Sequence, residues 1–149
     1  GGPIVTHRME TSVPGVFACG NVVHVNDLVD NVSDEASVAG SAAAAFALGR
    51  TPRSERWIEI KAGERVRSVV PQRVSASGVN TVTLDLRAAE VIDDAVVVLV
   101  AGDRVLASYK RRRVRPGEMV RIPILASQMD SIPFECGSIR VSIERGEVR

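Results

Sequence analysis

Few residues of this chain combine the type and the spacing that catalysis or metal binding requires. The two histidines, His7 and His24, have no cysteine or acid at ligand spacing, so the sequence predicts no metal site. Cys19 and Cys136 form no C-x-x-C pair. We expect both to be reduced thiols, with a single bridge between them as the open alternative. Since no G-x-S-x-G or comparable signature occurs either, the sequence identifies no catalytic residue.

The most specific pattern is the stretch TSVPGVFACGN, residues 11–21. A Pro-Gly turn leads into a short apolar segment, which is predicted to be a buried strand that contains Cys19 and ends at Gly20-Asn21. A thiol in the middle of a buried strand is unreactive, so Cys19 is expected to be inert.

An alanine-rich helix is predicted after a polar loop, in SDEASVAGSAAAAFALG. Ser33 is expected to cap its N-terminus, and Asp34 and Glu35 place acids in the first turn, where the helix dipole favours them. One face carries only very small side chains, so the helix is expected to lie close against a sheet. That face consists of Ala39, Gly40, Ala43 and Ala47.

The stretch 11–21 resembles the second flavin-binding motif of the pyridine nucleotide-disulfide oxidoreductase superfamily, in its thioredoxin-reductase-like form. That motif has Thr, Pro, Ala and Gly at fixed offsets, followed by Asp, and all but the Asp are present here. Asn21 stands in place of the Asp; its amide oxygen accepts a hydrogen bond but carries no charge. The resemblance covers roughly the first fifty residues. The continuation is similar to FAD-dependent oxidoreductases in which a β-rich tail follows the flavin domain.

The resemblance implies that the chain helps to bind FAD. Gly20 would let the backbone approach the cofactor, Asn21 would accept a hydrogen bond from a ribitol hydroxyl, and the helix start at 33–36 would face the isoalloxazine. The residues assigned to FAD in this way are Gly20, Asn21, Asp34, Glu35 and Ala36. Two alternatives stay open, namely that Gly20-Asn21 is only a turn that ends a strand and that the acids serve the helix dipole alone. His24 would face the flavin as a proton donor or substrate anchor, or is a loop histidine bonded to backbone.

Other parts of a flavoprotein are missing from this sequence. No G-x-G-x-x-G occurs, so the site for the FAD pyrophosphate lies elsewhere. The NAD(P) site that the resemblance implies also lies outside the chain. We therefore interpret residues 1–52 as the C-terminal piece of an FAD-binding domain. The chain would be the C-terminal portion of an FAD- and NAD(P)-dependent oxidoreductase, inactive by itself, with the other domains of that protein as partners.

From residue 53 onward the pattern changes to that of β-strands. Seven candidate strands separated by turn residues predict an immunoglobulin-like β-sandwich over residues 53–149, with Gly102-Asp103 as a tight hairpin. The strands are WIEI, VRSVV, NTVTLDLR, AVVVLVA, RVLASY, MVRIPI and SIRVSIE. The predicted fold class is therefore mainly β, with a strand-loop-helix remnant of an α/β FAD-binding domain in front of the sandwich.

The composition excludes several classes of partner. A net charge of +1 and an aromatic content of 3% argue against nucleic-acid binding. The longest apolar run, residues 95–101, is too short to span a membrane, and the reduced thiols indicate a cytoplasmic protein. The basic segment YKRRRVRPGE, residues 109–118, fits either a charged sheet edge that blocks aggregation or a surface for an anionic partner.

A second function stays open at this point, that of an immunoglobulin-like interaction module without enzymatic activity. In the flavoprotein interpretation the sandwich serves assembly or shields the active site, and a homodimer or other subunits are further partners. In either case residues 1–50 cannot bury enough surface alone. We expect them to self-associate or to fold back onto the β-domain.

Overall fold

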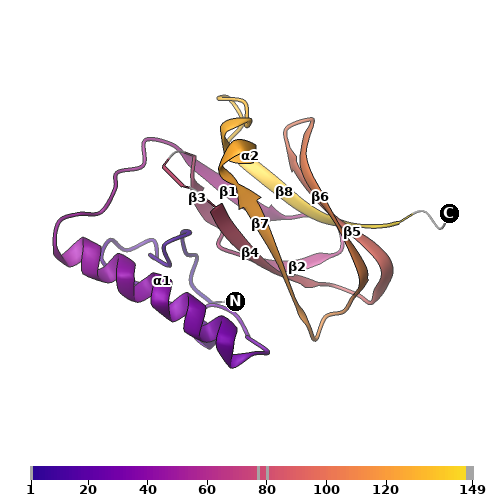
Figure 1. Ribbon diagram of the computed structural model, residues 1–149, viewed down its shortest axis with the longest axis horizontal. Coiled ribbons are helices and arrows are strands. Elements are labelled where there is room, and N and C mark those ends of the chain that lie inside the picture. The colour runs from indigo at the N-terminus through magenta and orange to yellow at the C-terminus, as the bar shows by residue number, and fades with distance from the viewer. Residues whose placement is uncertain (1, 77, 80, 147–149) are drawn as a thin grey trace.

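The computed structural model describes residues 2–76, 78–79 and 81–146, and it is mainly β. Two sheets pack face to face as a sandwich, and a long helix lies beside it (Figure 1). The strands are β1 (Trp57–Ala62), β2 (Val66–Val70), β3 (Arg73–Ser75), β4 (Thr81–Ala88), β5 (Ile92–Ala101), β6 (Arg104–Val114), β7 (Met119–Leu125) and β8 (Ser138–Arg145). The helices are the 3₁₀ turn η1 (Gly20–Val22), α1 (Val29–Ala47) and α2 (Ala126–Asp130).

All seven predicted strands are present, and β3 is an additional one that the sequence did not indicate. One sheet has the order β3-β1-β8-β5-β6 and the other the order β2-β4-β7. Among the described residues, neighbouring strands run antiparallel except β1 and β8, which run parallel. The predicted hairpin joins β5 to β6 at Gly102, whose φ of +59° suits glycine. Three residues are too few to show a period-2 pattern, which is why β3 was missed.

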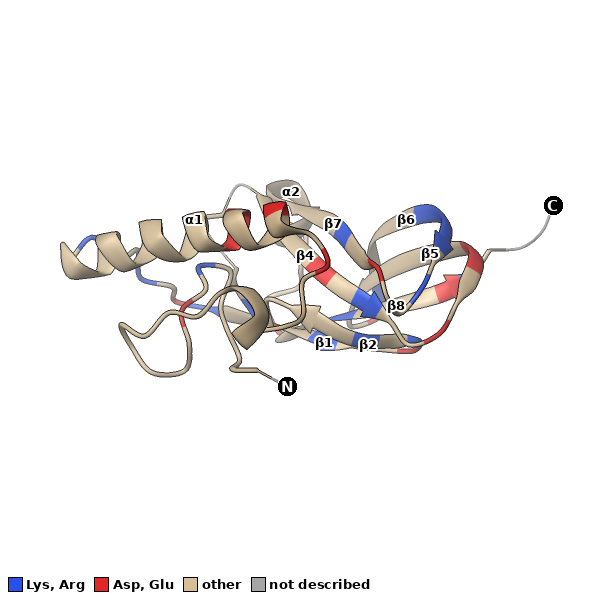
Figure 2. Cartoon of the chain, turned by 90° about the horizontal axis from the view of Figure 1, so that it is seen from below, with Lys and Arg blue, Asp and Glu red and all other residues tan. Residues whose placement is uncertain are grey.

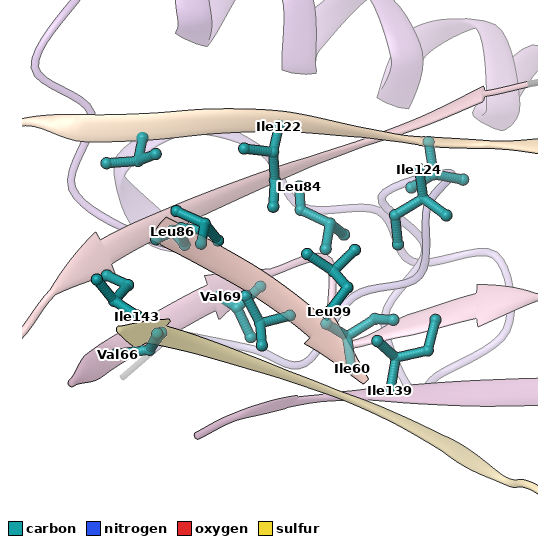
Figure 3. Packing of buried hydrophobic residues seen from close by; sticks show 14 of the residues in the cluster. Ile60, Val66, Val69, Leu84, Leu86, Leu99, Ile122, Ile124, Ile139 and Ile143 are labelled. Atoms are coloured by element: carbon teal, nitrogen blue, oxygen red, sulfur yellow. The ribbon is translucent and has the colours of Figure 1, made fainter. Parts of the chain in front are cut away.

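The core lies between the two sheets (Figure 3). Leu84 and Ile122 from the three-stranded sheet and Leu99 and Ile143 from the five-stranded sheet are part of this core, and all four are 0% exposed. The alternation along β4 predicted this arrangement for Leu84. Each such side chain contributes about 1.5–3 kcal/mol when it is fully buried.

The basic segment 109–118 lies at a sheet edge, as one of its two interpretations expects. Figure 2 shows Lys and Arg along β6, the outermost strand of its sheet. Tyr109 donates its hydroxyl to the Pro123 carbonyl at 2.6 Å, and Arg111 donates to the Arg121 carbonyl at 3.1 Å. Side chains of β6 thus bond to carbonyls of β7, the outermost strand of the other sheet, and close this side of the sandwich.

Residues 4–9 fold back onto the sandwich, one of the two outcomes expected for the N-terminal region. Thr6 forms a parallel bridge with Arg73 at the edge of β3, and His7 donates its N–H to the Arg73 carbonyl at 2.9 Å. A small second core forms at the junction, from Val5, Met9, Val23, Ala39 and Val70. The extended segments predicted before the helix are present only as isolated bridges, so Cys19 is half-buried and does not lie within a strand.

Helix α1 differs from its prediction in two respects. It begins at Val29, so Ser33 is not its cap; the Ser33 hydroxyl instead donates to the Val29 carbonyl at 3.1 Å. Only Ala39 of the small face is buried, and no atom lies within 4 Å of a Cβ placed on Gly40. The expected sheet does not cover this face, and the C-terminal half of α1 projects beyond the sandwich (Figure 2). In the described part of the chain, no helix has the length and hydropathy needed to cross a bilayer.

Candidate functional site

The stretch 11–21 folds into a tight loop that presents Gly20. Thr11 and Phe17 lie in facing arms, since Thr11 donates its N–H to the Val16 carbonyl at 2.8 Å and Glu10 bridges Phe17. The arms meet at Gly15, whose φ is +78°. The Thr11 hydroxyl accepts the Val13 N–H at 3.1 Å and so stabilises the turn. Thr11 therefore has a local structural role in the stretch.

Gly20 has the conformation that only glycine adopts easily. It is buried, its φ is +69°, and a Cβ added there would lie 3.3 Å from Cγ1 of Val32. Its N–H donates to Oε2 of Glu35 at 2.7 Å. The backbone at Gly20 is therefore fixed by a buried carboxylate of α1.

Asn21 and Ala36 are exposed, whereas Glu35 is only 3% exposed. The side-chain oxygen of Asn21 accepts the Asn26 N–H at 3.0 Å, which orders the loop before α1. Asp34 is also exposed and receives a hydrogen bond from Arg121 at 2.9 Å. The five residues assigned to FAD thus do not share one surface, because Glu35 points inward.

Glu35 is held by three donors. Oε1 is in contact with Nε2 of His24, and Oε2 accepts the Gly20 N–H. Burial alone would raise the pKa of Glu35, but His24, the Gly20 N–H and the Asn26 amide hold that pKa below its ordinary value. Glu35 is therefore ionised and ties the loop to the helix. His24 bonds to a carboxylate and not to backbone, in contrast to the loop-histidine alternative.

Asp85 of β4 lies next to this pair. It is 6% exposed, and Arg121 of β7 donates to both its oxygens, at 2.8 and 3.2 Å. Arg121 also reaches Asp34, and these two carboxylates hold the pKa of Arg121 above its ordinary value. One ligand atom from each of His24, Glu35 and Asp85 lies within 4.8 Å of the other two. The loop, the helix and the sandwich therefore meet in one buried charged cluster.

Sequence reasoning did not identify this cluster. The alternation along β4 placed Asp85 on the solvent side, and no local motif connects it to His24 or Glu35. Asp85 is at a strand position that faces away from the core between the sheets, where a carboxylate is ordinarily exposed. It is buried here because the N-terminal region covers that face. The basic residue that completes the cluster, Arg121, likewise belongs to an ordinary alternating strand.

A second set of contacts fixes the start of α1. Asp27 accepts the Met119 N–H at 3.1 Å and a hydrogen bond from Arg87 at 2.9 Å. Burial raises the pKa of Asp27, but these donors outweigh it and keep the pKa below its ordinary value. Because Asp27 is anchored to the sandwich, the chain turns at Leu28 and enters the helix four residues before Ser33.

A cleft of about 390 Å³ opens between α1 and the outer face of the three-stranded sheet. Thr83, Asp85 and Arg121 line the sheet side, and Asp34 and Val38 line the helix side. The lining of the cleft is therefore partly polar and partly apolar, and it includes Glu35 and Asp85 of the cluster.

Most of the large hydrophobic side chains that the described residues leave exposed lie in the N-terminal region. Val22, Val25 and Leu28 are 63%, 66% and 60% exposed on the loop beside Asn21, and Val29 is 77% exposed at the start of α1. Single exposed apolar residues are ordinary, but a contiguous group of them marks a surface that another element covers.

Comparisons with known proteins add no assignment to this geometry. No protein-family model, curated protein or solved structure matches the chain.

Proposed function

We propose that this chain is the C-terminal portion of an FAD- and NAD(P)-dependent oxidoreductase. Residues 1–52 are the C-terminal piece of its FAD-binding domain. Residues 53–149 form an immunoglobulin-like sandwich that serves assembly or shields the active site. FAD, when bound, supplies the hydride-transfer chemistry, and this chain supplies the backbone and side chains at one end of the cofactor.

The observation that carries this proposal is the geometry at Gly20. A flavin motif needs a glycine there so that the backbone can approach the cofactor, and Gly20 has a positive φ and lies between a tight loop and a helix. Its neighbour Asn21 is exposed, and one lone pair of its amide oxygen remains for a ribitol hydroxyl. A turn that merely ended a strand would not need the buried carboxylate of Glu35 to hold it.

The N-terminus of α1 supports the same proposal. No side chain caps the helix, so the N–H groups of its first turn, residues 29–32, retain their donor capacity. These N–H groups and the positive end of the helix dipole would stabilise the negative charge that grows on the flavin pyrimidine edge on reduction. In this arrangement Asp34 and Ala36 lie one turn further from the flavin than the resemblance alone suggested. Glu35 acts indirectly, by holding Gly20.

The exposed apolar surface supports the presence of a larger domain. The loop side chains Val22, Val25 and Leu28 would pack against the remaining sheet of an α/β domain. The interaction-module alternative also provides a partner for that surface, but it gives no reason for the geometry of Gly20.

The visible absorption of the natural protein that contains this chain tests the proposal. We expect bound flavin in the purified protein. Gly20→Val should abolish flavin retention, because a branched side chain is strained at a φ of +69° and its Cβ would lie 3.3 Å from Val32, which displaces the backbone that the cofactor is proposed to approach.

Gly102→Val is the matched control. Its φ of +59° imposes similar strain, but it lies in the β5–β6 hairpin with no atom within 4 Å of an added Cβ. We expect this variant to keep its flavin. A colourless natural protein that binds no added FAD, or a Gly20→Val variant with a full complement of flavin, would contradict the proposal.

A further inference from the structure

The buried cluster at the junction contains a set of groups that suits a divalent cation. His24 comes from the loop, Glu35 from α1 and Asp85 from β4, and their side chains are only 8%, 3% and 8% exposed. One imidazole and two carboxylates provide nitrogen and oxygen donors without a thiolate, a set that suits Zn²⁺ or Mn²⁺.

The spacing of the three groups is close to that of a metal site. Their ligand atoms lie within 4.8 Å of one another, whereas ligands at about 2.1 Å from a tetrahedral ion are about 3.4 Å apart. The atoms therefore need to approach by no more than about 1.4 Å. His24 and Glu35 are already in contact, so their two ligand atoms must instead move apart to let the ion take the place of the shared proton.

Arg121 does not prevent Asp85 from acting as a ligand. Each carboxylate oxygen has two lone pairs, and Arg121 uses one on each oxygen of Asp85. Hydrogen-bonded partners of this kind are a usual feature around metal-ligating carboxylates, which they orient. The Gly20 N–H serves Glu35 in the same way, because it occupies Oε2 and leaves Oε1 to face His24.

Asn26 gives a second, independent indication. Its side-chain oxygen is buried and has no hydrogen-bond partner among the described residues. The nitrogen of the same amide donates to the carbonyl of His24 at 3.4 Å, so the unpaired oxygen belongs to a side chain that is bonded to one of the three ligand residues. An unpaired buried oxygen is unfavourable, and a cation at the cluster would remove that cost.

We propose that His24, Glu35 and Asp85 bind a divalent transition-metal ion, beside the unpaired oxygen of Asn26. The ion joins the loop, α1 and the sandwich, so it clamps the N-terminal region onto the outer face of the three-stranded sheet. This site is independent of flavin, because all its ligands lie in the 149-residue chain.

Titration of the chain with Zn²⁺ tests the site. In a Cys19→Ser/Cys136→Ser background, which removes thiolate binding, we expect calorimetry to show one equivalent of Zn²⁺ bound and the melting temperature to rise. His24→Gln should weaken the affinity by at least about tenfold, since loss even of an outer partner typically costs 10–100-fold. Glu35→Gln should do the same. His7→Gln is the matched control and should bind like the unmodified background.

Nuclear magnetic resonance of the imidazole nitrogens provides a measurement that needs no cluster variant. The chain has two histidines, so their signals can be assigned from His7→Gln alone. We expect Zn²⁺ to shift the His24 ring nitrogens and to leave those of His7 in place. Absence of saturable Zn²⁺ binding, binding that survives His24→Gln unchanged, or a shift confined to His7 would each overturn the proposal.

Discussion

Residues 53–146 and residues 2–52 bury their hydrophobic side chains in different ways. The sandwich encloses a core of fully buried Leu, Ile and Val side chains between two sheets. The N-terminal region has a core of five buried residues, one of which, Val70, belongs to the sandwich. Its helix leaves Val29, Val38 and Phe46 exposed.

The difference indicates what stabilises each region. The sandwich is stabilised by its own apolar core. The N-terminal region is held largely by polar contacts to the sandwich, through His7, Asp27 and Asp34. Changes in the core should therefore affect global stability, whereas changes at the polar contacts should affect the position of the N-terminal region.

The same substitution should have very different effects in the two regions. Leu84 is 0% exposed between the sheets and Leu48 is 64% exposed at the end of α1. We expect Leu84→Ala to lower the free energy of unfolding by about 2–5 kcal/mol, because it removes buried methyl groups and leaves a cavity. Leu48→Ala should change it by less than about 0.5 kcal/mol. Urea unfolding followed by circular dichroism measures both, and equal losses would contradict the comparison.

Acid should weaken the contact between the N-terminal region and β3 through His7. Burial, assisted by Arg8, lowers the pKa of His7 to about 4, and its Nδ1 accepts the Ser75 N–H at 3.3 Å. The unfolded chain therefore takes up this proton first as the pH falls. The stability that neutral His7 contributes is complete above about pH 6.5 and is lost between there and about pH 4.

The expected loss from this titration is about 1–3 kcal/mol, at about 1.4 kcal/mol per pKa unit. His7→Asn separates it from other acid effects, because Asn retains an acceptor but does not titrate in this range. Unfolding free energies measured at pH 7 and pH 4.5 should differ less for the variant than for the natural chain. An identical pH dependence for both would show that His7 does not contribute.

Asp27 should determine where α1 begins. Asp27→Ala leaves the Met119 N–H and one donor of Arg87 without their acceptor, so we expect a loss of about 1–2 kcal/mol. Asp30→Ala, in the first turn of α1, is the control. It removes only a favourable interaction with the helix dipole, so the expected loss of unfolding free energy is about 0.3–1 kcal/mol. Amide hydrogen exchange should show faster exchange near Leu28 in Asp27→Ala alone. Equal exchange in the two variants would rule out the anchoring role.

The smallest expected effect is that of Asn21→Ala on flavin affinity in the natural protein. It removes one hydrogen bond to the cofactor, so we expect a loss of about 0.5–1.5 kcal/mol. Fluorescence titration of the apoprotein with FAD measures the change, and Ser41→Ala, at an exposed position further along α1, is the control. An unchanged affinity in Asn21→Ala would remove Asn21 from the flavin contacts.

The sequence by itself determined the strands and the composition of the core. Leu84 in β4 and Ile143 in β8 each belong to a strand in which apolar and polar residues alternate. This period of two places the apolar residues of each strand on one face, whichever element packs against that face. Glycine at position 102 determined the hairpin, because a positive φ is a local requirement. The resemblance of the stretch 11–21 to a flavin motif singled out Gly20 for its missing side chain; its positive φ, and an extended segment shorter than a strand, are findings of the structure.

Only the tertiary structure decided the junction. Asp85 was predicted to face solvent, and it is buried because His24 and Glu35 lie over the outer face of β4. The helix begins at Val29 because Asp27 is anchored by groups about sixty and ninety residues further along the chain. Periodicity and capping patterns describe the preferences of a segment alone. Contacts between charged groups that are distant in sequence depend on the docking of two regions, and no local pattern records that docking.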